Sequence, residues 1–151
     1  MNLPPSQSRN YERPAPLPLY ETTYARSECK IGIVHLGFGA FHRAHQALYI
    51  DGYMQATNDL RWGIAAVNLR AAEADQFAQN TAQITPENTA KQPGYVIKAM
   101  TTSGESEFTQ VRAHMGFYDW SKTPAKAEAL LASPDVHRLT ITVTESGYYL
   151  D

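Results

Sequence analysis

The fold of this chain is decided by the stretch Lys30-Ile-Gly-Ile-Val-His-Leu-Gly-Phe-Gly-Ala-Phe-His-Arg-Ala-His-Gln-Ala-Leu-Tyr49. Its apolar first part, residues 31–36, predicts a central parallel strand that is covered on both faces. A glycine turn follows, and apolar residues at spacings of three and four then predict a helix over about residues 41–54. A strand, a glycine turn and a helix in this order are typical of a cradle for the pyrophosphate of a dinucleotide.

Two glycines of the turn carry the binding interpretation. Gly37 lets the chain turn sharply at the end of the strand, and Gly39 has no side chain that would keep backbone amides away from a pyrophosphate. The third glycine of the common G-x-G-x-x-G pattern is replaced by His42. The generic pattern is therefore broken, and the assignment depends on the longer string around it.

The longer string, His-Leu-Gly-Phe-Gly-Ala-Phe-His-Arg-Ala-His-Gln at 35–46, resembles the N-terminal fingerprint of the polyol-specific long-chain dehydrogenases. This family includes mannitol 2-dehydrogenase, D-arabinitol 4-dehydrogenase, fructuronate reductase and tagaturonate reductase, and histidine is its normal residue at the third position. Residues 61–70 and 139–150 fit the same family in the same order, so the resemblance covers roughly residues 30–151. Mannitol and D-arabinitol dehydrogenase are the most similar subfamilies, with fructuronate reductase next.

The resemblance implies an oxidoreductase that uses NAD to interconvert a polyol or an aldonate with its ketose or keto acid by hydride transfer. In this family a catalytic lysine and its asparagine and histidine partners lie on a helical C-terminal domain, and none of the five lysines from Lys30 to Lys126 fits that motif. We therefore assign no catalytic residue and expect the chain alone to be inactive. The alternative is a non-catalytic module or truncated relic that binds a nucleotide or pairs with another chain.

The cofactor preference depends on residues just after the second predicted strand. The family's Leu-Arg-Glu-Xaa-Asp version has two acids there, whereas this chain has Ala71 at the first acidic position and Glu73 at the second. An acid there accepts hydrogen bonds from the adenosine ribose, and an arginine attracts the 2′-phosphate of NADP. We therefore expect a preference for NAD, with Arg70 making NADP tolerable.

The predicted cofactor-binding residues come from three segments of the chain. Thr144 and Glu145 are included because they follow the last strand, where ligands bind in open α/β sheets, although Glu145 could instead bond the turn at Gly147. Arg43 is available for a phosphate or is ordinary solvated surface, and His42 caps the turn or packs near the cofactor. The full set is Gly37, Phe38, Gly39, Ala40, Phe41, His42, Arg43, Asn68, Arg70, Glu73, Thr144 and Glu145.

Other candidate sites have simpler explanations. His42 and His45 have a spacing that can hold zinc, but no third ligand of matching geometry follows them, and we predict no metal. His114, His137 and the pair Asp119-Trp120 are interpreted as surface or hairpin residues.

Composition limits the class of protein. The chain has 151 residues, of which 43% are hydrophobic, and no run of about 20 apolar residues that could cross a bilayer. A net charge of −2 argues against nucleic acid and acidic membranes as partners. The single cysteine, Cys29, excludes an internal disulfide framework, and the first residues lack the order of a secretory signal. We expect a cytoplasmic protein.

The predicted organisation is an arm followed by one domain. Residues 1–28 hold five of the nine prolines and are expected to form an extended arm, which lies across the domain through Leu17, Leu19 and Tyr20 or is partly disordered. Residues 29–151 are expected to form a truncated dinucleotide-binding domain, without the C-terminal catalytic domain. The predicted elements after the first helix are a strand at 62–69, a helix at 71–80, a polar loop at 81–94, an antiparallel hairpin of 95–102 and 105–114, a helix from 124 to about 131 and a central strand at 139–144.

These elements predict an α/β fold, with a Rossmann-like, mostly parallel sheet and one antiparallel hairpin. A complete dinucleotide-binding fold contains two mononucleotide-binding halves, and the sequence stops before a second half. We therefore expect the sheet to be incomplete.

Overall fold

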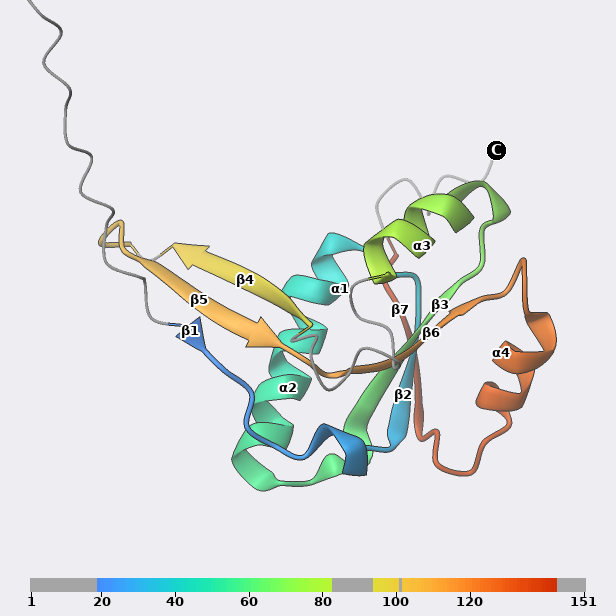
Figure 1. Ribbon diagram of the computed structural model, residues 1–151, viewed down its shortest axis with the longest axis horizontal. Coiled ribbons are helices and arrows are strands. Elements are labelled where there is room, and N and C mark those ends of the chain that lie inside the picture. The colour runs from blue at the N-terminus through green and yellow to red at the C-terminus, as the bar shows by residue number, and fades with distance from the viewer. Residues whose placement is uncertain (1–18, 83–93, 101, 144–151) are drawn as a thin grey trace, which may run out of the picture.

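The computed structural model describes residues 19–82, 94–100 and 102–143, and its centre is a four-stranded parallel sheet (Figure 1). The strands lie in the order β6-β3-β2-β7, and every neighbouring pair is parallel. Their bounds are Ile31–Leu36 for β2, Gly63–Asn68 for β3, His114–Asp119 for β6 and Arg138–Ile141 for β7. A parallel sheet whose strand order reverses at β2, where the chain crosses to β7, is typical of doubly wound folds and confirms the predicted α/β fold class.

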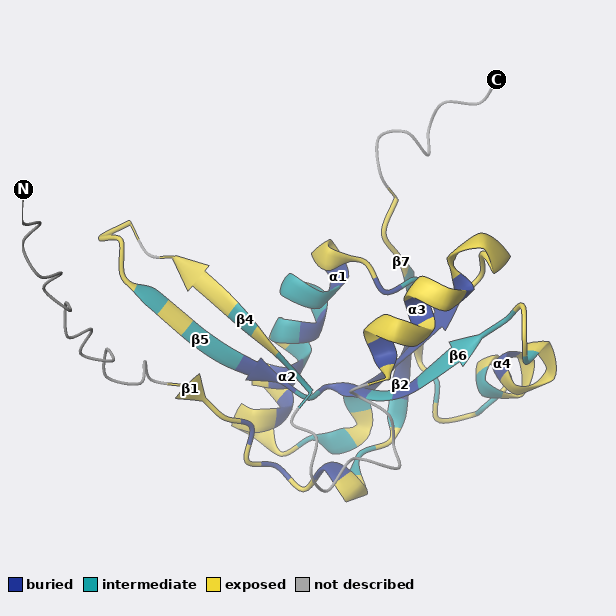
Figure 2. Ribbon diagram, turned by 45° about the horizontal axis from the view of Figure 1, so that its top comes forward, coloured by how far each residue is buried: buried dark blue, intermediate teal, exposed yellow. Residues whose placement is uncertain are grey.

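Helices cover both faces of this sheet. On one face, Ala47 and Met54 of α2 (Gln46–Thr57) pack against Ile33 and Ile64. On the other face, Ala127 of α4 (Pro124–Leu131) packs in a cluster with side chains of β2 and β3. Successive side chains of a strand point to opposite faces, so the near-continuous apolar runs of β2 and β3 supply both clusters. Figure 2 shows burial concentrated in this sheet and exposure on the outer sides of α3 and α4.

Two predicted helices have different bounds in the structure. The helix expected over 41–54 is divided into α1 (Ala40–Ala44) and α2, and His45 stands between them with φ −119° and ψ −79°. The helix expected over 71–80 starts as the 3₁₀ turn η3 (Ala71–Glu73) and continues as α3 (Ala74–Thr81). Two further 3₁₀ turns are η1 (Arg26–Glu28) and η2 (Leu60–Trp62). Helical periodicity is the same on both sides of a short break, so the pattern does not reveal the break.

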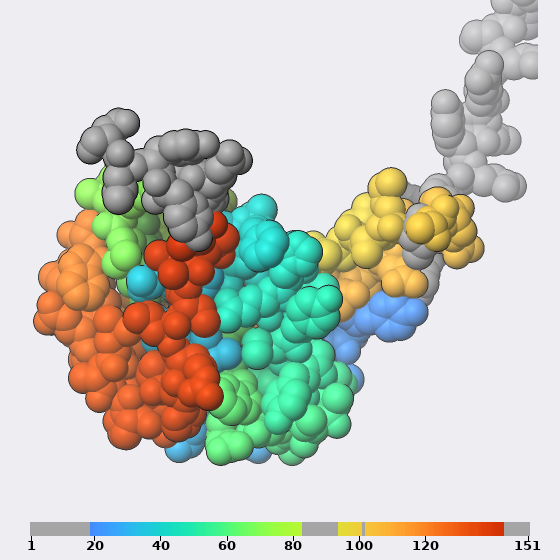
Figure 3. All heavy atoms as spheres, turned by 180° about the vertical axis from the view of Figure 1, so that it is seen from behind, coloured from blue at the N-terminus to red at the C-terminus, as the bar shows by residue number. Residues whose placement is uncertain are grey.

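The predicted hairpin is present and forms part of a second sheet. β4 (Tyr95–Met100) and β5 (Ser106–Val111) pair antiparallel, and β1 (Leu19–Tyr20) pairs parallel with β5. Figure 3 shows this three-stranded sheet projecting from the body of the molecule. The predicted end of the hairpin at residue 114 was wrong, because β5 stops at Val111 and His114 opens β6 in the parallel sheet.

The last strand lies at an edge of the parallel sheet among the described residues, where the sequence predicts a central strand. Leu139 and Ile141 are 57% and 60% exposed. The apolar composition of a strand shows what the strand can bury, but it does not show whether a neighbour covers it.

The described part of the predicted arm, residues 19–28, is bonded to the domain. The Asp51 carboxylate of α2 accepts hydrogen bonds from Tyr24 Oη at 2.8 Å, Thr22 Oγ1 at 2.9 Å and the Arg112 backbone N–H at 2.7 Å. Burial nevertheless raises the pKa of Asp51 above its ordinary value. Leu19 and Tyr20 pair alongside β5 as the parallel strand β1, and Leu17 is outside the described residues.

Candidate dinucleotide-binding site

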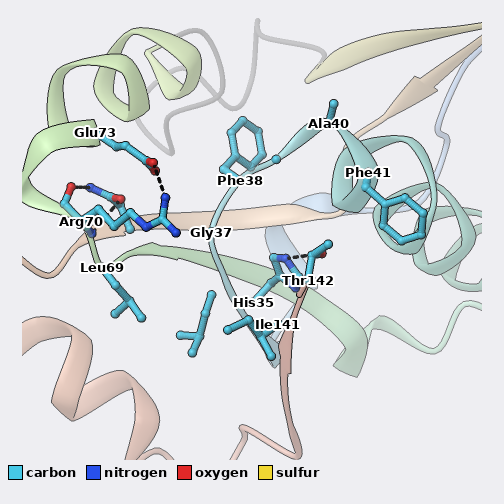
Figure 4. A pocket seen from close by; sticks show the side chains of 13 residues that line it. His35, Gly37, Phe38, Ala40, Phe41, Leu69, Arg70, Glu73, Ile141 and Thr142 are labelled. Carbon is cyan, nitrogen blue, oxygen red and sulfur yellow. Dashed lines mark hydrogen bonds and ion pairs between the residues drawn. The ribbon is translucent and has the colours of Figure 1, made fainter. Parts of the chain in front are cut away.

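A pocket of about 390 Å³ lies at the carboxyl ends of β2, β3 and β7 (Figure 4). Its volume is within the range of small-molecule sites, and its place at the strand ends is where open α/β sheets bind ligands. The pocket is lined by His35, Leu36, Gly37, Phe38, Gly39, Ala40, Phe41, Asn68, Leu69, Arg70, Glu73, Ile141 and Thr142.

The glycine turn forms one wall of this pocket. Gly37 has φ +103°, a conformation that side-chain-bearing residues rarely adopt, and its N–H donates to Val67 O at 2.7 Å. Gly39 is the N-cap of α1, where no side chain caps the helix, and a Cβ added to Gly39 would meet no atom within 4 Å. A Cβ at position 39 would thus lie in the open cradle rather than against the protein, which fits the role of a pyrophosphate-binding glycine.

Phe38, between the two glycines, points inward. Its ring packs edge-on against His114 and Phe117, with ring centroids 5.0 and 5.2 Å apart. The Arg43 guanidinium carbon lies 5.2 Å from the Phe38 ring centroid, and Arg43 is not among the residues that line the pocket. In the structure, therefore, Arg43 covers the inner side of the turn.

His42 lies beneath the turn and is only 1% exposed. Its ring stacks on His35 with centroids 3.6 Å apart, and its Nε2 lies 2.9 Å from Nε2 of His114. The interpretation of His114 as a surface or hairpin residue was wrong, because His114 is fully buried. It was missed because its element, β6, was not predicted as a separate strand.

The three buried imidazoles favour the neutral form. Burial lowers the pKa of His35 and of His42 to about 4, and it lowers the pKa of His114 well below the ordinary value. Among the described residues there is no group of three or more histidine, cysteine, aspartate or glutamate side chains that could hold a metal ion.

The opposite wall of the pocket follows the end of β3. Asn68 fixes the chain there, because its Nδ2 donates to Arg70 O at 3.0 Å and its Oδ1 accepts from the Arg70 N–H at 3.2 Å. The Arg70 guanidinium then pairs with the Glu73 carboxylate, with Nη1 and Oε1 2.8 Å apart. Both side chains are largely exposed at the rim of the pocket, where a ligand can reach them.

Eight of the twelve predicted cofactor-binding residues therefore line one pocket. His42 and Arg43 lie behind the turn, and Thr144 and Glu145 are outside the described residues. The prediction omitted His35, Leu36, Leu69, Ile141 and Thr142, which also line the pocket. Their positions at or beside the carboxyl ends of predicted parallel strands were the available signal.

Comparison with known proteins gives consistent sequence matches. The family model described as the mannitol dehydrogenase Rossmann domain matches residues 31–149. Mannitol 2-dehydrogenase of Pyrenophora tritici-repentis is 36% identical over 132 residues, which are 85% of this chain and 21% of the relative. D-arabinitol 4-dehydrogenase of Klebsiella pneumoniae is 36% identical over 121 residues, which are 78% of this chain and 24% of the relative.

Solved structures give the same result. A substrate-free D-sorbitol dehydrogenase aligns with a TM-score of 0.74 and 26% identity, over 89% of this chain and 27% of that protein. Mannitol 2-dehydrogenase of Pseudomonas fluorescens, solved as a ternary complex with NAD and D-mannitol, aligns with a TM-score of 0.72 and 26% identity. This alignment covers 86% of this chain and 25% of that protein. The chain thus spans about a quarter of the length of these proteins. By its sequence, its sheet topology and its glycine turn, the chain belongs to the mannitol dehydrogenase family and contains part of that family's Rossmann domain.

Proposed function

We propose that this chain is the N-terminal nucleotide-binding portion of an NAD-dependent oxidoreductase that interconverts a polyol with its ketose. The observation that carries this proposal is that the glycine turn, the strand ends and the Arg70–Glu73 pair line one and the same pocket. Relatives named for mannitol and D-arabinitol support a polyol substrate, and the structural neighbour solved with NAD supports the cofactor.

The pocket suggests a place for each part of the dinucleotide. Gly37 and Gly39 of the turn would hold the pyrophosphate, and the Glu73 carboxylate would accept hydrogen bonds from the adenosine ribose. When bound, the cofactor supplies the hydride-accepting nicotinamide ring. This chain's residues bind and orient the cofactor, and Arg70 compensates part of the charge of a 2′-phosphate, so NADP binds less tightly than NAD rather than being excluded.

The substrate-binding and catalytic groups belong, in this proposal, to a further domain. The chain spans only about a quarter of the relatives' length, which supports a longer enzyme. Exposed apolar side chains that line the pocket, Phe41 on α1 and Ile141 on β7, also favour further packing. We assign residues 29–151 to the nucleotide-binding domain and residues 1–28 to an arm, and we place the protein in the cytoplasm. Within the described residues, no helix has the length and apolar character to cross a membrane.

The test is titration of NADH into the full 151-residue chain by calorimetry, with Gly39→Val as the variant. We expect NADH binding by the parent chain and at least about a tenfold loss in Gly39→Val, because the valine side chain fills the cradle. The variant should keep its fold, with at most the cost of a less favoured N-cap residue, since a Cβ at this position meets no atom within 4 Å. Equal affinity of the two proteins would place the pyrophosphate elsewhere, and no NADH binding by the parent chain would refute the proposed function.

A further inference from the structure

The residue that replaces the third glycine is tightly held, which points to a role of its own. The third glycine of the common pattern allows close packing of helix on strand. Here the His42 ring occupies the space between α1 and the sheet, stacked on His35 of β2 with an interplanar angle of 7°. The helix also breaks three residues later, at His45. An imidazole therefore separates helix and sheet at the position where the common pattern has no side chain.

The hydrogen bonds of this cluster have a definite order. His42 Nδ1 lies 2.9 Å from Oε1 of Gln46, which is an acceptor only, so Nδ1 carries the proton. In a neutral ring Nε2 is then a lone pair, and the 2.9 Å contact between the two Nε2 atoms requires His114 to donate. The remaining nitrogen of His114, Nδ1, has no hydrogen-bond partner among the described residues. Within the described parts of the chain, His42 is thus the single hydrogen-bonding partner of the His114 ring.

The His114 ring is in turn a support for the glycine turn. Phe38 packs edge-on against it at 5.0 Å, and Phe117 stacks against it at 5.6 Å with an interplanar angle of 17°. Phe38 is the residue between Gly37 and Gly39, so its anchoring determines how the turn faces the pocket. His42, His114 and Phe38 form a continuous series of contacts from α1 to the turn.

We propose that His42 is a positioning residue of the dinucleotide site: it accepts a hydrogen bond from His114, fixes that ring against Phe38, and thereby holds the glycine turn in its binding conformation. This inference rests on the proposed function of the pocket. It assigns His42 an indirect part in binding, because its side chain faces away from the pocket, and it gives a structural reason for histidine in place of the third glycine.

The first test is the protonation of the two rings, measured by long-range ¹H–¹⁵N correlation on the full histidine-labelled chain at pH 7. We expect neutral rings, with the proton of His42 on Nδ1 and that of His114 on Nε2. The opposite tautomers, or a charged ring at this pH, would overturn the proposed order of hydrogen bonds. This measurement does not depend on nucleotide binding.

The second test compares His42→Ala and His42→Gln with a matched control, His137→Ala, an exposed histidine just before β7 at the far end of the sheet. His42→Ala should weaken NADH binding about tenfold and speed hydrogen exchange of the Phe38 and Gly39 amides about tenfold, from loss of one buried hydrogen bond and its packing. The His42→Gln side chain offers an amide oxygen to His114 and should restore both quantities to within about threefold. The control should leave both unchanged.

The outcomes separate the two proposals. If the parent chain fails to bind NADH, the proposed function fails, while amide exchange still tests whether His42 holds the turn. If NADH binds normally and the turn amides of His42→Ala exchange as in the control, the positioning role is overturned. If His42→Ala does not fold, the proposal is tested by His42→Gln and by the tautomers of the parent chain. A folded His42→Gln variant in which the amides of Phe38 and Gly39 exchange fast would contradict the proposed hydrogen bond.

Discussion

The rim pair Arg70–Glu73 predicts how a single substitution changes cofactor preference. Glu73→Ala removes the carboxylate that we place against the adenosine ribose and releases Arg70, whose Nη1 lies 2.8 Å from Glu73 Oε1. The released guanidinium is then available to a 2′-phosphate. We therefore expect NADH to bind less tightly and NADPH to bind more tightly than to the parent chain.

The magnitude follows from the exposure of the two side chains, 76% for Arg70 and 55% for Glu73. An exposed ion pair is worth only about 0.2–1 kcal/mol, so breaking it costs little. A hydrogen bond to a charged group contributes about 1.5–3 kcal/mol, and the lower end applies at an exposed rim. NADH should thus lose about tenfold in affinity. NADPH should gain a few-fold, and the ratio of the two dissociation constants should shift by about thirtyfold.

The assay is fluorescence titration of NADH and NADPH at one fixed, low ionic strength, because salt screens the phosphate contribution. Asp75→Ala is the matched control, since this carboxylate is two residues away and 96% exposed, and its loss changes the net charge equally. Arg70→Ala is the reciprocal variant, which should weaken NADPH and leave NADH nearly unchanged. An unaltered ratio in Glu73→Ala, or an equal shift in Asp75→Ala, would refute the assignment of Glu73, and tighter NADPH binding by the parent chain would refute the NAD preference.

Two further predictions concern catalysis and acid stability. The 151-residue chain alone should not oxidise D-mannitol or D-arabinitol. Orientation of the substrate against the nicotinamide lowers the barrier by about 7–11 kcal/mol, and it needs groups beyond the described site. NADH formation followed at 340 nm checks this, and turnover at an ordinary enzyme rate would contradict it. The free energy of unfolding should fall as the pH drops from about 6.5 towards 4. Burial lowers the pKa of His35 and of His42 to about 4 in the folded chain. Between these pH values the unfolded chain therefore binds more protons than the folded chain. Urea midpoints at pH 7, 5.5 and 4.5 measure this, and a midpoint that is constant between pH 7 and 5 would contradict it.

Most of the local order of elements, with β6 as the exception, could be predicted from the sequence by itself. The apolar run of β2, the glycine turn and the helix after it are encoded in consecutive residues, because strand and helix periodicities and the conformational freedom of Gly37 act over a few positions. The same holds for the β4–β5 hairpin and for the proline that starts α4. From these elements the parallel sheet, the position of the pocket and eight of its lining residues follow, because parallel strands bring their carboxyl ends to one edge.

Only the tertiary structure decided which distant side chains meet beneath the turn. His35, His42 and His114 come from β2, α1 and β6, and the last two are 72 positions apart in the chain. No local pattern marks His114 as buried, since its burial arises from the pairing of β6 with β3. The exposed edge of β7 was also visible only in the structure, because the sequence of an apolar strand does not show whether a neighbouring strand covers it. Burial and long-range contact are properties of the packed chain, whereas periodicity and turn chemistry belong to consecutive residues.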